Sequence, residues 1–254
     1  MKAPRHLSSL GDALRHLAGQ GGTARFWLRD DDAVEPTPAL DRLLELGQRY
    51  AVPIALAVIP ARADWALARR LAQASHATPL VHGWAHANHS QPGEKKQELD
   101  RHRASEIVIA EMSCALRRMT ALFGDRLSPV LVPPWNRVEP GLLKHLPDLG
   151  YRAISAFGKV PAQMPLPTIN THADVMDWHG TGGCRDHSIL SDEIARLVMT
   201  PENGQAVGIL THHLVHDESV WQFVEKLFEL TAGSSICRWL SIADLLGEYD
   251  GIAK

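Results

Sequence analysis

Short apolar runs alternate along this chain with stretches in which apolar residues recur every three to four positions. The run at residues 53–59 (PIALAVI) predicts a strand that is covered on both faces. Similar runs predict strands at residues 24–28, 79–82, 130–132, 152–155, 206–211 and 237–240. Helical spacing predicts helices at residues 37–50, 64–75 and 103–122, and helices that begin near residues 139, 191, 218 and 241. Asp64 is a candidate helix cap.

This order of elements predicts an α/β fold with a parallel sheet of about seven strands. Periodicity alone is compatible with a closed or nearly closed β/α barrel and with an open, doubly wound sheet. The 254 residues suit one large domain, so we expect residues 1–254 to form a single domain. An amphipathic helix over about residues 5–18 is expected before the first strand, with Leu7, Leu10, Leu14 and Leu17 on its apolar face.

Composition and charge narrow the class of protein. Apolar residues make up 45% and charged residues 22%, which is typical of a globular protein, and the formal net charge of −3 gives no reason to expect nucleic acid or an acidic membrane as a partner. No apolar stretch predicts a membrane span, and no signal peptide is evident, so we expect a cytoplasmic protein. Cys114, Cys184 and Cys237 are too widely spaced to predict a disulfide framework or a thiolate zinc cluster.

Candidate chemistry follows several of the predicted strands, where the catalytic groups of parallel α/β folds gather. Asp30, Asp31 and Asp32 come directly after the first run. Held close together at a sheet edge, three carboxylates repel one another, and a cation would relieve that repulsion. A solvated turn with a helix-capping aspartate is the alternative interpretation.

His82 and His86 lie four residues apart after the third run. Two imidazoles at this spacing converge on one ion from a helical turn or from a tight loop at Gly83, although a chance pair of surface histidines is equally compatible with the pattern. Two histidines with one carboxylate suit zinc, and also iron(II), cobalt or nickel.

His212 and His213 follow the penultimate strand, and strand alternation predicts that only one of them faces a site. Histidine changes its charge near neutral pH, which suits a proton donor, while two ordinary loop histidines remain the alternative. A cysteine nucleophile formed by Cys184 with His187 is disfavoured because no oxyanion element accompanies it.

Together these motifs resemble those of the polysaccharide deacetylases with the NodB-homology domain, carbohydrate esterase family four and its relatives. That family carries, in order, an Asp-Asp pair, His-[Ser/Thr]-x-x-His, an arginine before Pro-Pro-Tyr, Asp-x-x-Asp-Trp and Leu-x-His. The corresponding segments here are Arg29–Ala33, His82–His86, Val132–Trp135, Asp174–Trp178 and Leu210–His212. The resemblance implies a distorted (β/α)7-type barrel of the glycoside hydrolase and deacetylase kind.

The resemblance also implies roles for individual residues. Asp31 would be the general base and His212 the general acid, with Asp30 and Asp31 as the alternative register of the acidic pair and His216 as the alternative acid. The metal ligands would be Asp32, His82 and His86. The substrate groove would be lined by Pro134, Trp135, Asp177 and Trp178. Val132 departs from the pattern because it replaces the family's arginine, whose charge Arg29 or Arg137 could supply.

We therefore expect a metal-dependent hydrolase, with zinc as the most suitable ion, that removes an acyl group, typically acetyl, from an amide- or ester-linked carbohydrate. Its partner would be a small-molecule or oligosaccharide substrate. Two alternatives remain open on the same fold: a metal-independent hydrolase of small or cyclic amides, and a carbohydrate-binding relative without turnover.

Overall fold

The computed structural model describes residues 7–160, 164–200 and 205–252, and the chain divides into two compact units. Unit 1 comprises Met1–Asp30, Thr37–Ile54 and Thr171–Ser241. Unit 2 comprises Asp31–Pro36, Ala55–Asn170 and Ile242–Lys254. Each unit contains parallel strands and helices, as the alternating pattern predicts.

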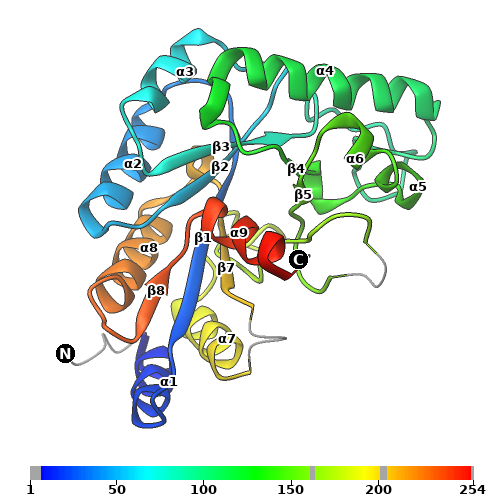
Figure 1. Cartoon of the computed structure of the whole chain (residues 1–254). Coiled ribbons are helices and arrows are strands. Elements are labelled where there is room, and N and C mark those ends of the chain that lie inside the picture. The colour runs from blue at the N-terminus through cyan, green and yellow to red at the C-terminus, as the bar shows by residue number, and fades with distance from the viewer. Residues whose placement is uncertain (1–6, 161–163, 201–204, 253–254) are drawn as a thin grey trace. The chain divides into compact units, whose positions relative to one another are not determined.

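In unit 1, strand β1 (Ala24–Ala33) pairs in parallel through its first residues with two other strands. One neighbour is β7 (Val207–Thr211), which in turn pairs with β6 (Ala173–Asp174), and the other is β8 (Cys237–Trp239). The helices of this unit are α1 (Ser8–Gly19), α2 (Pro38–Tyr50), α7 (His187–Met199) and α8 (Glu218–Thr231), and a short turn, η5 (His213–Val215), follows β7 (Figure 1).

In unit 2, the strand order is β2 (Ile54–Val58), β3 (Ala77–His82), β4 (Val130–Val132) and β5 (Ala153–Ile154). The register places His82 opposite Val132 in a parallel pair, so both residues end their strands at one edge. The helical elements of this unit are α3 (Trp65–Ala72), α4 (Ser105–Phe123), η2 (Gly124–Arg126), η3 (Pro134–Asn136), α5 (Pro140–Leu143), α6 (Leu146–Leu149) and α9 (Ile242–Ile252) (Figure 1).

Helix starts follow their capping side chains. The Asp64 carboxylate accepts hydrogen bonds from the backbone N–H groups of Ala66 and Leu67, which confirms the predicted cap. Helix α7 begins at His187 rather than at the predicted residue 191, because Asp186 caps it through the Ser188 and Ile189 amides. The helix predicted from residue 139 is instead two short helices, α5 and α6, and Pro147, which has no N–H to donate, lies in the first turn of the second.

The first strand does not end at Leu28 as predicted but continues through the acidic triplet to Ala33. Arg29, Asp30 and Asp31 are buried within it. The prediction ended the strand where the apolar run ends, but a charged side chain tolerates burial when its polar atoms are bonded, as those of Asp30 are. Strand β6 was also missed, since it has two residues and therefore no periodicity to detect.

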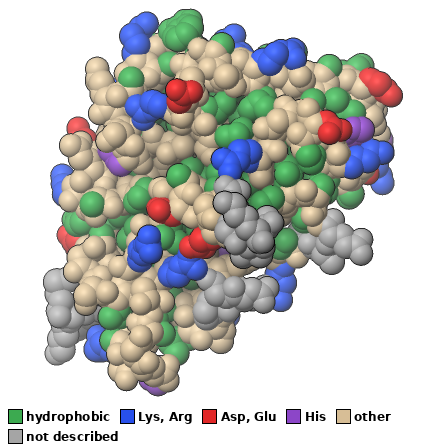
Figure 2. Space-filling model, in the orientation of Figure 1, with side chains coloured by type: hydrophobic (Ala, Val, Ile, Leu, Met, Phe, Trp, Pro, Cys, Tyr) green, Lys and Arg blue, Asp and Glu red, His purple; other side chains and the backbone are tan. Residues whose placement is uncertain are grey.

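Helix α1 covers most of the predicted N-terminal helix, and residues 5 and 6 of that prediction lie outside the described residues. Leu10 and Leu14 are buried on its inner face, and the Leu10 amide donates to the Ser191 hydroxyl of α7 at 3.1 Å. Within the described ranges, no helix is both long and apolar enough to cross a bilayer. Lysine, arginine and carboxylate side chains are interspersed over the face shown in Figure 2.

Candidate metal centre and active site

The three predicted metal ligands, Asp32, His82 and His86, lie together in unit 2. The Nε2 atom of His82 is 3.1 Å from Oδ1 of Asp32, and the Nε2 atom of His86 is 3.3 Å from the same oxygen. One potential donor atom from each residue lies within 4.8 Å of the other two. His82 is buried and the other two are half-buried, so the cluster has an open side.

The end of strand β4 orients His82. Its Nδ1 lies 2.9 Å from the Val132 carbonyl oxygen, so an N–H at that position donates to the backbone and leaves Nε2 facing Asp32. Burial alone lowers the pKa of His82, but the hydrogen bond to Asp32 and the charges of Asp31 and Asp32 outweigh it and raise the pKa. Position 132 therefore contributes a carbonyl, and its valine side chain is fully buried.

A buried carboxylate, Glu98, holds the loop that carries His86. It accepts hydrogen bonds from the backbone amides of Trp84 at 2.9 Å, Ala85 at 2.7 Å and Ala87 at 3.2 Å. A Cβ atom on Gly83 would lie 2.0 Å from Oε2 of Glu98, and the φ of Gly83 is +55°. Glycine therefore stands where the resembling family has Ser or Thr, because the Glu98 carboxylate fills the space of a side chain.

Replacing Glu98 by glutamine should weaken zinc binding about 10–100-fold, because an amide has one acceptor oxygen and its NH₂ group opposes the backbone donors of the loop. Competition titration with a chromogenic chelator measures the affinity, and circular dichroism checks that the fold persists. Glu106→Gln, at an exposed carboxylate in the first turn of α4, is the matched control. Equal affinity in wild type and Glu98→Gln would show that this carboxylate does not support the site.

The backbone around the cluster is strained. Five non-glycine residues in the described ranges have positive φ, and four of them belong to the cluster or to the turn beside it: Asp32 (74°), His86 (56°), Trp135 (53°) and Asn136 (57°). Such conformations cost about 1–3 kcal/mol each and concentrate at functional sites. The surrounding hydrogen bonds, including those of Glu98, hold this geometry in place.

Trp135 and Pro134 form one wall of the cluster. The Trp135 ring lies 4.2 Å from the His86 ring between centroids, and Pro134 is buried against Gly83. Burial is the main reason that the pKa of His86 is lowered, and the nearby His82 lowers it further. A lowered pKa favours the neutral imidazole, which is the form that binds metals.

The three aspartates of the triplet have separate surroundings. Asp31 is buried, and its charge acts on His82. Asp30 instead accepts hydrogen bonds in unit 1 from the Thr211 hydroxyl at 2.7 Å and from the backbone amide of His213 at 2.9 Å, and it pairs with His213 Nδ1. Burial alone would raise the pKa of Asp30, but the charge and hydrogen bonds of His213 lower it below its ordinary range. This arrangement favours Asp31 and Asp32 over Asp30 and Asp31 as the functional pair.

His212 and His213 point to different surroundings, as strand alternation predicts. His213 is buried with Asp30, whereas the His212 ring meets the edge of Trp178 at 4.7 Å between centroids. Nδ1 of His212 is buried without a hydrogen-bond partner in the described part of the chain. What separates the two histidines is that His213 pairs with the buried Asp30 carboxylate, whereas His212 lies beside the exposed ring of Trp178.

His216 supports the backbone of His212, since its Nε2 accepts the His212 amide at 3.2 Å and its ring packs against Trp221. Burial lowers the pKa of His216 to about 4. A residue that is neutral over most of the pH range and bonded in this way is better suited to positioning than to proton donation.

This pKa predicts a pH dependence of stability. Below about pH 6.5 the unfolded chain protonates His216 while the folded chain does not, so the folded protein loses stability as the pH falls from about 6.5 towards 4. Substituting glutamine (His216→Gln) should reduce that loss, which can be measured as the difference in melting temperature between pH 6.5 and 4.5. Equal losses in the two proteins would contradict the assignment.

The remaining predicted substrate residues lie in unit 1. Trp178 is 49% exposed, and its indole N–H donates to the Asp174 carboxylate at 2.8 Å. The Asp177 carboxylate accepts the Thr181 amide at 2.9 Å within a local turn, a bond that lowers its pKa. Trp178 thus offers an exposed aromatic face, and Asp177 shapes the turn beside it. Burial raises the pKa of Cys184 to about 11, which argues against a thiolate nucleophile.

The two arginines considered as replacements for the family's arginine have different settings. Arg29 is fully buried in unit 1. Arg137 is half-buried in unit 2, where Nη1 donates to the Lys96 carbonyl at 3.0 Å. That Arg29 or Arg137 replaces the charge of the family's arginine stays a prediction.

Sequence reasoning missed two supporting interactions. Glu98 lies in an irregular polar loop 11 to 14 residues from the amides that it binds, where no periodicity marks it. The pair formed by Asp30 and His213 is 183 residues apart in the chain. The only available signal was the repulsion within the triplet, which required a separate partner for at least one carboxylate.

The fold is that of the NodB-like deacetylases, a distorted (β/α)7 barrel, which confirms the expected fold class. A Mycobacterium smegmatis protein assigned to the polysaccharide deacetylases matches with a TM-score of 0.70 and 13% identity over 92% of each chain. The chitin deacetylase of the fungal pathogen Colletotrichum lindemuthianum matches with a TM-score of 0.60 and 19% identity, over 89% of this chain and 88% of the other.

A family 4 acetyl xylan esterase from Clostridium thermocellum, solved with a cobalt ion, matches with a TM-score of 0.54 and 15% identity, over 89% of this chain and 92% of the other. No family model and no curated protein sequence matches this chain. At these identities the likeness establishes the fold, and the chemistry must be argued from the residues.

Proposed function

We propose that this protein is a metal-dependent hydrolase that removes acetyl or a similar acyl group from an acylated carbohydrate. The observation that carries the proposal is the convergence of Asp32, His82 and His86 donor atoms within 4.8 Å of one another. On an unrelated fold these residues would indicate a metal site of unspecified use. On a deacetylase fold they suggest acyl hydrolysis.

The donor set fits a divalent ion. Two imidazoles and one carboxylate with an open side are the ligands of many catalytic zinc sites, and His82 carries the backbone hydrogen bond that commonly orients such a ligand. Zinc is therefore the ion that we propose, although cobalt, nickel and iron(II) suit the same donors. Once bound, such an ion acidifies water and polarises a carbonyl group.

The protein's own residues would manage the protons. Asp31, buried next to Asp32 in the chain, would accept the proton of the attacking water, as the family resemblance implies for this position, and its charge acts on the proposed ligand His82. His212 would donate a proton to the departing amine or alcohol through a ring nitrogen. The exposed ring of Trp178 and the ring of Trp135 beside His86 would bind the sugar.

The solved neighbours support this class of substrate. They include a chitin deacetylase and an acetyl xylan esterase, so an amide-linked and an ester-linked acetyl group are both plausible substrates for this fold. The cobalt ion in the latter structure supports a metal in the proposed chemistry.

Release of acetate from acetylated saccharides tests the proposal. The zinc-loaded protein is assayed with N-acetylglucosamine oligomers and with acetylated xylan, beside chelator-treated protein. We expect acetate release that disappears with the chelator and returns when zinc is added. Acetate release that continues undiminished in the metal-free protein would favour metal-independent hydrolysis. If neither acetylated saccharide releases acetate, both are rejected as substrates.

A further inference from the structure

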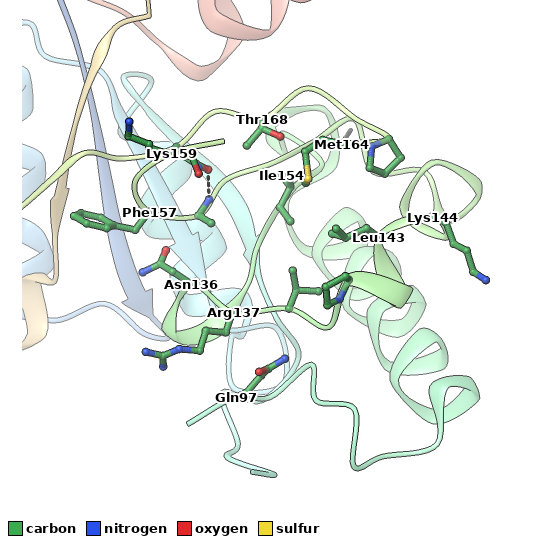
Figure 3. Close-up of a pocket in the computed structure, with 15 residues that line it drawn as sticks. Gln97, Asn136, Arg137, Leu143, Lys144, Ile154, Phe157, Lys159, Met164 and Thr168 are labelled. Atoms are coloured by element: carbon green, nitrogen blue, oxygen red, sulfur yellow. Dashed lines mark hydrogen bonds between the residues drawn. The ribbon is translucent and has the colours of Figure 1, made fainter. Parts of the chain in front are cut away.

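Beside the metal-ligand cluster, unit 2 contains a cavity of about 760 Å³ that no step of the proposed chemistry uses (Figure 3). Its volume lies in the range of small-molecule binding sites. Figure 3 shows Phe157, Asn136 and Arg137 in succession along one side, with Ile154, Leu143 and Met164 turned toward one another on the other. The cavity thus combines an apolar floor with a polar side.

The charge of the lining has one sign. Arg137, Lys144 and Lys159 belong to it, and among the described residues that line the cavity none is aspartate or glutamate. In Figure 3 the ammonium group of Lys144 extends away from the other labelled residues, whereas the Arg137 side chain lies near Gln97. Nη1 of Arg137 donates to the Lys96 carbonyl, which fixes the side chain and leaves several of its five N–H donors for a ligand. A fixed guanidinium favours carboxylate or phosphate.

Hydrogen bonds hold the backbone on both sides of Phe157 in place. Asn170, which is 4% exposed, accepts the Ala156 amide at 2.8 Å and donates to the Gly158 carbonyl at 2.9 Å. These bonds bracket Phe157 and hold its ring, 41% exposed, at the cavity. An exposed aromatic face beside amide groups is suited to a sugar ring, which has apolar faces and a polar edge.

The cavity lies close to the ligand cluster along the chain. Trp135 contacts the His86 ring, and Asn136 and Arg137, the next two residues, line the cavity. Two residues span at most about 7 Å of backbone, so one substrate can reach from the cluster to the cavity. Trp135 and Asn136 both have left-handed backbones, which turn the chain between the two places.

We propose that this cavity is a subsite for an acidic sugar unit, whose phosphate or carboxylate binds Arg137 while its ring packs on Phe157. The inference rests on the proposed function, because it makes the substrate an anionic acylated saccharide. Phosphate and carboxylate share the chemistry that the guanidinium recognises, and the test separates them.

Calorimetric titration tests the subsite without turnover. The probes are neutral N-acetylglucosamine, its 6-phosphate and N-acetylmuramic acid, each titrated into metal-free wild type, Arg137→Met, Arg137→Lys and Lys95→Met. Lys95 is exposed and does not line the cavity, so its variant removes one positive charge elsewhere on the same unit. The acidic probe that binds more tightly identifies the preferred anion.

We expect at least one acidic probe to bind wild type about tenfold more tightly than the neutral sugar, as a hydrogen-bonded charge provides. Arg137→Met should abolish the preference, Arg137→Lys should retain part of it, and Lys95→Met should keep it. Equal affinity for neutral and acidic probes, no detectable binding of either acidic probe, or a preference that survives in Arg137→Met would overturn the proposal. The acetate assay fails or succeeds separately, so a preference without acetate release would reject the tested acetylated saccharides as substrates while leaving the subsite.

Discussion

Replacing Asp31 by asparagine should lower turnover about 100- to 10,000-fold while the protein still binds its metal. Asparagine has nearly the same shape as aspartate but cannot accept a proton from water. Asp31 is buried, and both histidines of the cluster contact Asp32, so this change should leave the ligands in position. Acetate release and metal content, measured on the same sample, check both halves of the expectation.

Asp192→Asn is the matched control, because Asp192 is exposed on helix α7 and the same chemical change there should leave turnover unaltered. Full activity of Asp31→Asn would reject its role as the base. Loss of the metal together with activity would instead indicate that Asp31 is a ligand and that the register of the acidic pair is shifted by one residue.

Replacing His82 by alanine should have the second large effect, the loss of metal binding. The change removes a ligand nitrogen and the hydrogen bond to the Val132 carbonyl that orients it, so we expect zinc affinity to fall more than about 100-fold. Zinc at about 100 times its dissociation constant should stabilise the wild type by about 2.7 kcal/mol. The same zinc concentration should leave the melting temperature of His82→Ala almost unchanged.

His89→Ala is the control for this experiment, because His89 is an exposed histidine three residues beyond His86. It should respond to zinc as the wild type does. A zinc-induced rise in melting temperature that is equal in His82→Ala and wild type would mean that the ion binds elsewhere, for which the histidine-containing group formed by Glu94, Asp100 and His102 is a candidate.

The sequence contains enough information to predict the fold class and the ligand cluster. The apolar runs predict the buried strands β2 and β7, and the spacing of His82 and His86 singles out the two imidazoles that converge on Asp32. These features depend on the spacing of apolar residues and on where strands end, and both can be recognised from the residue types in the sequence. The family motifs add order and roles that periodicity cannot provide.

The supporting geometry could not be predicted in the same way. Glu98 binds three backbone amides of an irregular loop. Residue types in a sequence do not show which backbone amides a carboxylate will bind. Strand β1 runs through Asp30 because Thr211 and His213, distant in the chain, satisfy that carboxylate. Left-handed backbone at Asp32 and His86 is likewise imposed by tertiary contacts, against the preference of the residues themselves.

The metal content of the purified protein, measured by elemental analysis beside the double variant Asp32→Ala, His82→Ala, tests the proposed metal centre most directly. We expect close to one divalent ion per wild-type chain after loading with zinc, and almost none in the variant. A wild type that retains no metal after loading, or a variant that retains as much as the wild type, would contradict the assignment of Asp32, His82 and His86 as a metal centre.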